Sequence, residues 1–212
     1  MNIVRNLLVI LILVFPLSLA AQSSEFGVFI SQPQIQSTSL ADDPAFDIRV
    51  EFDGDQGYGI SYNRYWTDHV STEFALQRLS SGVTLTVGGP AIEATFPAGD
   101  LDLTALSGVA QWHFGTRSRI VPYVGAGIVH VTGEASGPDD PTDPTSPVTT
   151  DDLESKTSFI ANAGIDFRVT PNIAITFDAR YFSYDAVAEE DPLAEPIALD
   201  TYVYSAGVKL RF

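Results

Sequence analysis

The chain has 212 residues, of which 11 are Lys or Arg and 27 are Asp or Glu, so its formal net charge is -16. This length suits one domain, and so strong a negative charge excludes nucleic acid as a partner. Cysteine is absent, which excludes disulfide bonds and thiolate metal sites.

The first residues have the layout of a secretory signal peptide. Arg5 precedes an apolar run over 7–15, and small residues occupy the -3 and -1 positions of a cleavage site before Ala21. The run is shorter than the about 20 apolar residues that a transmembrane helix needs. We therefore predict a cleaved signal peptide over 1–20 and an exported domain over 21–212, with an uncleaved anchor as the alternative.

After this segment, apolar and polar residues alternate in a series of short stretches. A period of two places successive side chains on opposite faces of a β-strand. In the first stretch, Phe26, Val28 and Ile30 share one face. The predicted strands cover residues 26–31, 57–66, 70–77, 106–114, 120–130, 158–169, 173–182 and 201–212. Strands of about ten residues have the length that crosses a bilayer at a tilt.

The connections between these stretches alternate in length. Thr67–His69, Gly115–Ser118 and Thr170–Asn172 are short. The other connections are long and cover residues 34–45, 80–100, 134–154 and 185–199. Long loops at one end and tight turns at the other are typical of an outer-membrane barrel. A soluble sandwich has no reason to sort its loops in this way.

One face of the strands carries charges and the other carries almost none. In a soluble sandwich the charged face would meet water, whereas in a barrel it lines the interior and the apolar face meets lipid. Export, the sorted loops and aromatic residues near the short turns favour the barrel, because aromatic belts mark membrane interfaces. These aromatic residues are Trp66, Trp112, Phe114, Phe167 and Phe212. The predicted fold is all-β: an eight-stranded antiparallel transmembrane β-barrel of the outer membrane, with long extracellular loops and short periplasmic turns.

The charged face predicts a network inside the barrel. Its acids are Glu73, Asp166 and Asp178, and its bases are Arg168, Arg180, Lys209 and Arg211. A barrel of about eight strands is filled by side chains or holds one small ligand. We therefore expect cross-strand ion pairs that plug the periplasmic half, with an ion-selective pore as the alternative.

The chain ends on a strand with an apolar face that includes Tyr204, Val208, Leu210 and Phe212. This last strand has to pair with the first, because only a closed barrel satisfies every backbone amide in lipid. A terminal aromatic residue behind alternating apolar residues resembles the signal by which the barrel-assembly machinery recognises its clients. The resemblance implies that this machinery and periplasmic chaperones are partners during biogenesis.

Three segments give the chain a resemblance to the OmpW-type family of small outer-membrane barrels. Pro122–Ile128 reads Pro-Tyr-Val-Gly-Ala-Gly-Ile, Ala161–Phe167 reads Ala-Asn-Ala-Gly-Ile-Asp-Phe, and the chain closes on Ser205–Phe212. A tight turn at Thr67–Asp68 also fits. The resemblance implies a Gram-negative, porin-like conduit for small hydrophobic molecules, with an apolar pocket open at the outer end and a lateral exit between strands.

Val129, Val131, Phe182 and Val203 are candidates for lining such a pocket in the extracellular half. A filled, polar lumen would instead favour a structural or surface-interaction barrel that acts through its loops. Those loops are acidic: residues 134–154 carry seven acids and no Lys or Arg. They are either solvated surface or weak Ca²⁺ or Mg²⁺ sites that bridge to lipopolysaccharide phosphates. Outer-membrane lipids and lipopolysaccharide are the expected surroundings.

The sequence predicts no catalytic, cofactor or metal site. The histidines are His69, His113 and His130, and none stands beside an obvious Ser and Asp. The Gly-x-Gly at Gly125–Gly127 continues as a strand, so it does not predict a dinucleotide site.

Overall fold

The computed structural model describes residues 23–36, 38–43, 46–89, 92–115, 118–138, 146–186 and 197–212. The predicted signal peptide over 1–20 lies outside them. The strands are β1 (Ser24–Ile35), β2 (Thr38–Asp43), β3 (Phe46–Gly54), β4 (Gly57–Tyr65), β5 (Val70–Gly89), β6 (Ile92–His113), β7 (Ile120–Pro138), β8 (Val148–Arg168), β9 (Ile173–Ala186) and β10 (Ile197–Arg211). Among the described residues, no helix is long and apolar enough to span a membrane.

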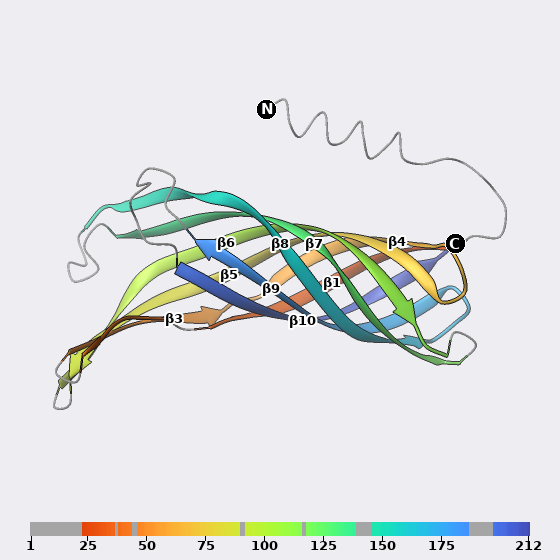
Figure 1. Ribbon diagram of the computed structural model, residues 1–212, viewed down its shortest axis with the longest axis horizontal. Helices are drawn as coiled ribbons and strands as arrows, with labels where there is room; N and C mark the ends of the chain where they lie inside the picture. The colour runs from red at the N-terminus through yellow and green to blue at the C-terminus, as the bar shows by residue number, and fades with distance from the viewer. Residues whose placement is uncertain are drawn as a thin grey trace, which may run out of the picture.

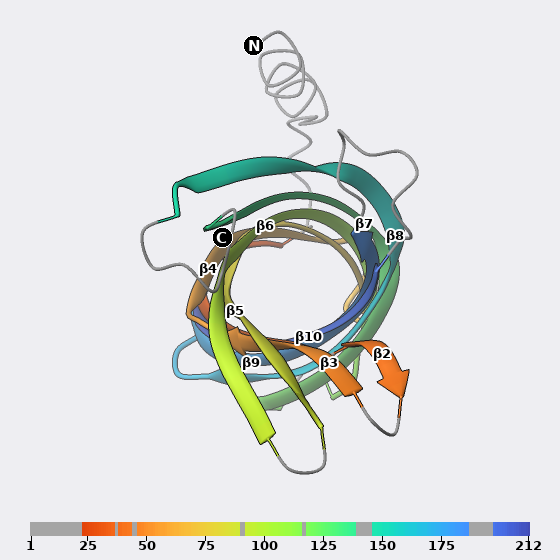
Figure 2. The ribbon, with the colours of Figure 1, turned by 90° about the vertical axis from the view of Figure 1, so that its left-hand side faces the viewer.

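Eight of these strands close into a ring (Figure 2). Its order is β4-β1-β10-β9-β8-β7-β6, and β5 closes it by pairing with both β4 and β6. All of these pairings are antiparallel, and β1 pairs with β10 from Glu25↔Arg211 to Ile35↔Thr201. Each strand of the ring therefore has a hydrogen-bonded neighbour on both sides, which is what the interior of a bilayer requires. The predicted eight-stranded barrel is confirmed.

Side chains alternate between the lumen and the outer surface. In β1 the outward Phe26, Val28 and Ile30 are exposed, whereas the residues between them are buried. The aromatic residues predicted near the short turns are also on the outer surface. The apolar face of the strands is thus the outer face, and the polar face lines the lumen, the reverse of a soluble sandwich.

The short turns form where the sequence predicts them, and threonine hydroxyls stabilise two of them. The hydroxyl oxygen of Thr67 accepts hydrogen bonds from the N–H groups of His69 and Val70 at 3.2 and 3.0 Å. Thr170 accepts from the two equivalent N–H groups of its turn. In the third turn Gly115 adopts a φ of 64°, a left-handed conformation that favours glycine.

Two of the predicted long loops are wrong, because the strands continue through them as hairpins. β5 and β6 stay paired as far as Gly89↔Ile92, and β7 and β8 as far as Pro138↔Val148. The stretch Ser81–Gly89 alternates Val and Leu with Gly and Thr, which is a strand pattern. These hairpins project from one end of the ring (Figure 1), here called the hairpin end, and the opposite end is the turn end.

The predicted loop over 34–45 likewise contains strand, and β2 pairs with β3. β3 in turn pairs with β5 from Asp47↔Gly88 to Gly54↔Ser81, directly beyond the pairing of β5 with β4. The pairing of β6 with β7 stops at Asp100↔Ser136. At the hairpin end the ring therefore divides into a four-stranded arm, β2-β3-β5-β6, and a two-stranded arm, β7-β8.

Glycine allows β1 to close against both of its neighbours. Phe29 points into the lumen and has Gly59 of β4 and Gly207 of β10 as its register partners. A Cβ atom at Gly207 would lie 2.3 Å from the carbonyl oxygen of Val28 and 2.6 Å from the Cβ of Phe29. Only a residue without a side chain fits there unless the backbone moves.

We expect Gly207→Ala to lower the free energy of unfolding by about 1–3 kcal/mol, because the methyl group overpacks the seam between β1 and β10. Gly108→Ala is the matched control, since a Cβ there meets nothing closer than 3.6 Å. Urea unfolding in lipid vesicles, followed by tryptophan fluorescence, measures both variants. Equal stability of the two would contradict the close packing described here.

Candidate functional site: a lumen in two halves

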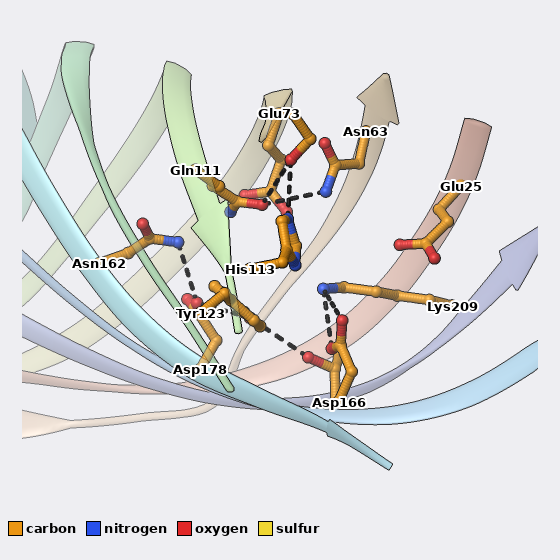
Figure 3. Close-up of polar contacts among 12 residues, drawn as sticks. Glu25, Asn63, Glu73, Gln111, His113, Tyr123, Asn162, Asp166, Asp178 and Lys209 are labelled. Carbon is orange, nitrogen blue, oxygen red and sulfur yellow. Dashed lines mark hydrogen bonds and ion pairs between the residues drawn. The ribbon is translucent and has the colours of Figure 1, made fainter. Parts of the chain in front are cut away.

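Ion pairs fill the turn-end half of the lumen. Nη2 of Arg180 on β9 reaches across to Oε1 of Glu73 on β5 at 2.7 Å, and its Nε lies 2.5 Å from Oδ1 of Asp178. Lys209 on β10 contacts Asp166 on β8 at 2.9 Å, as Figure 3 shows. All five side chains are buried. Two of the three pairs join strands that are not neighbours in the sheet, so they bridge the inside of the ring.

Another ion pair joins the first and last strands of the ring. Arg211 donates from Nε and Nη2 to Oε1 of Glu25, both at 2.8 Å. The hydroxyl of Tyr65 donates to Oε2 of the same carboxylate at 3.0 Å, and the Arg211 guanidinium lies over the Tyr65 ring. The remaining predicted interior charge, Arg168, is half-buried near the end of β8.

Sequence reasoning missed Glu25 and Tyr123 as members of this network. Glu25 precedes the first predicted strand by one residue, but it shares the alternation of Gly27 and Phe29, and that was the available signal. Tyr123 donates its hydroxyl to Oδ2 of Asp178 at 2.9 Å, and Nζ of Lys209 lies 4.5 Å from its ring centre. The hydroxyls of Tyr65 and Tyr123 thus each add a hydrogen bond to a carboxylate of an ion pair, Glu25 and Asp178 respectively.

Among the residues described, this half holds a cavity of about 10 Å³ whose lining includes Glu73, Tyr123, Asp178, Arg180 and Lys209. A cavity of this size accommodates one water molecule. It is far too small for an organic solute. The turn-end half is therefore closed by side chains rather than open as a channel.

Apolar side chains fill the lumen toward the hairpin end. The predicted pocket residues Val129, Val131, Phe182 and Val203 all lie there, each 0% exposed. They belong to one cluster, whose other members are Ile35, Leu79, Leu101, Leu103, Ala105, Val109, Ile160, Tyr184 and Leu199. The change from polar to apolar side chains falls at different places on different strands, and buried Ser107 on β6 and Thr201 on β10 each stand between two members of the apolar cluster. On β9, for example, Arg180 is in the polar half and Phe182 in the apolar half.

The apolar lining continues from the lumen onto the four-stranded arm. Phe52 of β3 and Val83 of β5 are register partners, are partly buried, and pack against the lumen cluster. Beyond them Leu85 and Val87 follow on the same face of β5, and Phe96 of β6 is the register partner of Leu85. A half-buried apolar track therefore leads from the tip of the arm to the lumen.

The wall of the barrel is incomplete between β8 and β9. Their backbone pairing extends from Arg168↔Ala174 to Ile160↔Phe182 and stops there, although both strands continue. Beyond that point side chains join them within the described chain: Ser158 donates its hydroxyl to the carbonyl of Ser183, and Tyr184 donates to the carbonyl of Glu154 at 2.8 Å. This seam lies at the level of the apolar cluster, since Ile160, Phe182 and Tyr184 belong to it.

The histidines do not form a common site in the described structure. His69 stacks on Trp112, and His130 contacts Thr157 on the outer surface. Nε2 of His113 is 2.8 Å from the hydroxyl of Ser71, a contact that the sequence analysis did not predict. Both of these side chains are 0% exposed. A substrate therefore cannot reach them, and nucleophilic catalysis needs such access.

The comparisons with known proteins agree with this geometry. A family model described as "Outer membrane protein beta-barrel domain" matches residues 7–212. No curated protein sequence matches. The crystal structure of OprG from Pseudomonas aeruginosa is similar, with a TM-score of 0.61 and 15% identity over 91% of this chain and 96% of that one.

Two further solved structures have the same fold. Neisserial surface protein A has a TM-score of 0.57 and 16% identity, over 91% of this chain and 98% of its own. Ail of Yersinia pestis has a TM-score of 0.53 and 15% identity, over 91% and 100%. At such low identity the likeness establishes the barrel and leaves the role of the lumen to be argued from its residues.

We expect Arg180→Met to destabilise the folded barrel by about 3–5 kcal/mol, because it leaves the buried carboxylates of Glu73 and Asp178 without their cation. Arg78→Met is the matched control: its pair with Asp102 is exposed, at 3.3 Å, and such pairs contribute no more than about 1 kcal/mol. Urea unfolding in vesicles measures the difference. Equal losses of unfolding free energy in the two variants would contradict a structural role for the ion pair of Arg180 with Glu73 across the lumen.

Proposed function

The chain belongs to the outer membrane protein β-barrel domain family, and from that premise we propose that this outer-membrane protein is a conduit for small hydrophobic molecules. The observation that carries the proposal is the division of the lumen. An apolar half faces the hairpin end, and a half closed by ion pairs faces the turn end. In this family's orientation the hairpins are extracellular and the turns periplasmic.

The residues in and around the apolar half define the proposed route. A solute would enter along the apolar track on the four-stranded arm, over Leu85 and Val83, and then displace cluster side chains such as Val129 and Phe182. Because ion pairs close the lumen below, the solute would leave sideways, through the seam between β8 and β9. Lipid is the favourable destination for an apolar molecule.

Within the family we propose that the chain is of the OmpW type. Pro122–Ile128 and Ala161–Phe167, which carry the resemblance, lie on β7 and β8 beside the turn-end half of the lumen. No enzymatic activity is part of the proposal, because the histidine with a serine partner is inaccessible.

A structural or surface-interaction barrel is the second candidate, and one observation favours it. The apolar cluster is packed so closely that its central side chains are 0% exposed. In that case the hairpins would act on lipopolysaccharide or on another partner outside the cell, and the lumen would serve stability alone.

Uptake of the fluorescent hydrophobic probe N-phenyl-1-naphthylamine separates the two candidates. Cells with and without the protein are compared after its insertion into the outer membrane has been verified. The conduit predicts faster uptake only when the protein is present. Equal uptake of this probe and of several smaller apolar compounds would reject the conduit and favour the structural role.

A disulfide across the proposed exit should block transport. The chain has no cysteine, so Phe159→Cys/Ser183→Cys introduces a single pair at the seam. Oxidation is expected to reduce uptake to the level of cells without the protein, and a reductant to restore it.

The control for this experiment is Ile165→Cys/Phe177→Cys, which joins paired positions of the same two strands and should leave uptake unchanged. Unchanged uptake with the seam disulfide fully formed would reject the lateral exit.

We further propose that residues 1–20 are a signal peptide. We also propose that the barrel-assembly machinery recognises the apolar face of the last strand, which comprises Tyr204, Val208, Leu210 and Phe212.

Phe212→Ala is expected to lower the amount of folded protein in the outer membrane severalfold. It should leave the stability of protein refolded in vesicles nearly unchanged, because the backbone bonds between residue 212 and Ser24 remain. Phe114→Ala removes another exposed aromatic residue at the turn end and is the control. Equal effects of the two changes on assembly would contradict a terminal signal.

A further inference from the structure

Lys156 on β8 lies at the seam through which the proposed conduit opens to the membrane. It stands midway between Glu154 and Ser158, the two residues of β8 that side-chain hydrogen bonds join to β9. Its register partner is Val131, a fully buried member of the apolar cluster. Register partners share one face of a sheet, so the Lys156 side chain is on the lumen face. A positive charge therefore borders the proposed exit, beside the apolar half of the lumen.

The ammonium group of Lys156 is only weakly paired in the described structure. Its ion pair is with the carboxylate of Glu154 at 3.9 Å, which is longer than a hydrogen bond. Both side chains are partly accessible, and such pairs are weak. By contrast, Arg180 and Lys209 on the lumen face donate to carboxylates at 2.7 and 2.9 Å. An ammonium group has three donors, so those of Lys156 can bond to water or to a passing solute.

The hydroxyl groups that join the strands at the seam already use their protons. Tyr184 donates to the carbonyl of Glu154 at 2.8 Å, and Ser158 donates to the carbonyl of Ser183. Each hydroxyl has one proton to donate. A solute that enters the seam therefore finds its hydrogen-bond donor in Lys156, which stands between these two bonds.

Charge and desolvation select the class of solute that Lys156 favours. An anion would have to pass the two-stranded arm, whose exposed acids include Glu134, Asp151 and Asp152, and then displace Glu154. A cation would be repelled by the ammonium group itself. A hydrocarbon would displace water from the ammonium group without replacing the lost hydrogen bond, which is costly in apolar surroundings. A neutral solute with an accepting oxygen replaces that bond.

From this geometry we propose that Lys156 is a specificity-determining residue at the exit, which favours hydrophobic solutes that carry a neutral carbonyl group over hydrocarbons. The ammonium group donates to the carbonyl oxygen, and the apolar part of the solute contacts the cluster around Val131. This role of Lys156 rests on the proposed function, because it requires solutes to leave through the seam between β8 and β9.

Acetophenone and ethylbenzene test the preference, because they differ only by a carbonyl oxygen in place of two hydrogens. Each competes with N-phenyl-1-naphthylamine for uptake by cells, and the concentration that halves the protein-dependent uptake is measured. Comparing wild type with Lys156→Met for each compound cancels the difference in their partitioning. We expect the substitution to raise this concentration about tenfold for acetophenone, which loses a hydrogen bond to a charged group. For ethylbenzene the concentration should stay the same or fall.

Two further variants separate the charge from the packing of the side chain. Lys156→Arg keeps a cationic donor and should retain the preference for acetophenone. Arg78→Met is the matched control, because it removes an exposed cation paired with Asp102 on the outer surface, and it should change the competition by neither compound. Uptake is normalised to the amount of each variant in the outer membrane.

The outcomes distinguish this role from the conduit itself. Equal changes for the two compounds in Lys156→Met, or the same changes in Arg78→Met, would overturn the role of Lys156 and leave the conduit standing. Stronger competition by benzoate than by acetophenone would overturn the preference for a neutral carbonyl group. Absence of protein-dependent uptake of the fluorescent probe would reject the conduit, and the role of Lys156 with it.

Discussion

Closure of the sheet between β1 and β10 is the constraint on which the rest of this structure depends. In lipid an unpaired backbone amide has no water to bond to, so the first and last strands have to meet along their length. A ring of eight strands is narrow, and its lumen has to be filled by side chains. Gly59 and Gly207 make room for Phe29 at the closing seam, and the ion pair of Glu25 with Arg211 joins the same two strands.

The narrow lumen also explains why its charges are paired. A buried charge without a partner is strongly destabilising, and the cavity beside Arg180 and Lys209 has room for about one water molecule. Arg180 and Lys209 therefore bridge to carboxylates on strands across the ring. The apolar half needs no such pairing and is closed by packing alone. Its side chains can move aside without exposing a charge, which is why a hydrophobic solute, and not an ion, is the proposed cargo.

The parts of the fold that depend on local sequence could be predicted, and the parts that depend on three-dimensional register could not. Alternation with a period of two identified the membrane strands and their outer face, and Thr67 and Thr170 stand in turns that were expected. The projecting hairpins were missed: the stretch before Val148 is rich in Asp and Pro, which are typical of turns, and the strand-like alternation around Val83 was not used.

The same limit applies to the site. The sequence predicted which charges line the lumen, but it could not predict that Glu73 meets Arg180, since that contact depends on how the strands of the closed ring are staggered. The contact of Ser71 with His113 and the seam between β8 and β9 were missed for the same reason. The OmpW-type resemblance implied a lateral exit but gave no position for it.

Ion conductance across a planar lipid bilayer tests the central claim most directly, namely that side chains seal the turn-end half while the apolar half remains the route. The account predicts that wild-type protein inserted into the bilayer gives no steady ionic current above that of the bare membrane. Stable, stepwise openings with a defined ion selectivity would contradict it, because they would require a continuous aqueous path past Arg180 and Lys209.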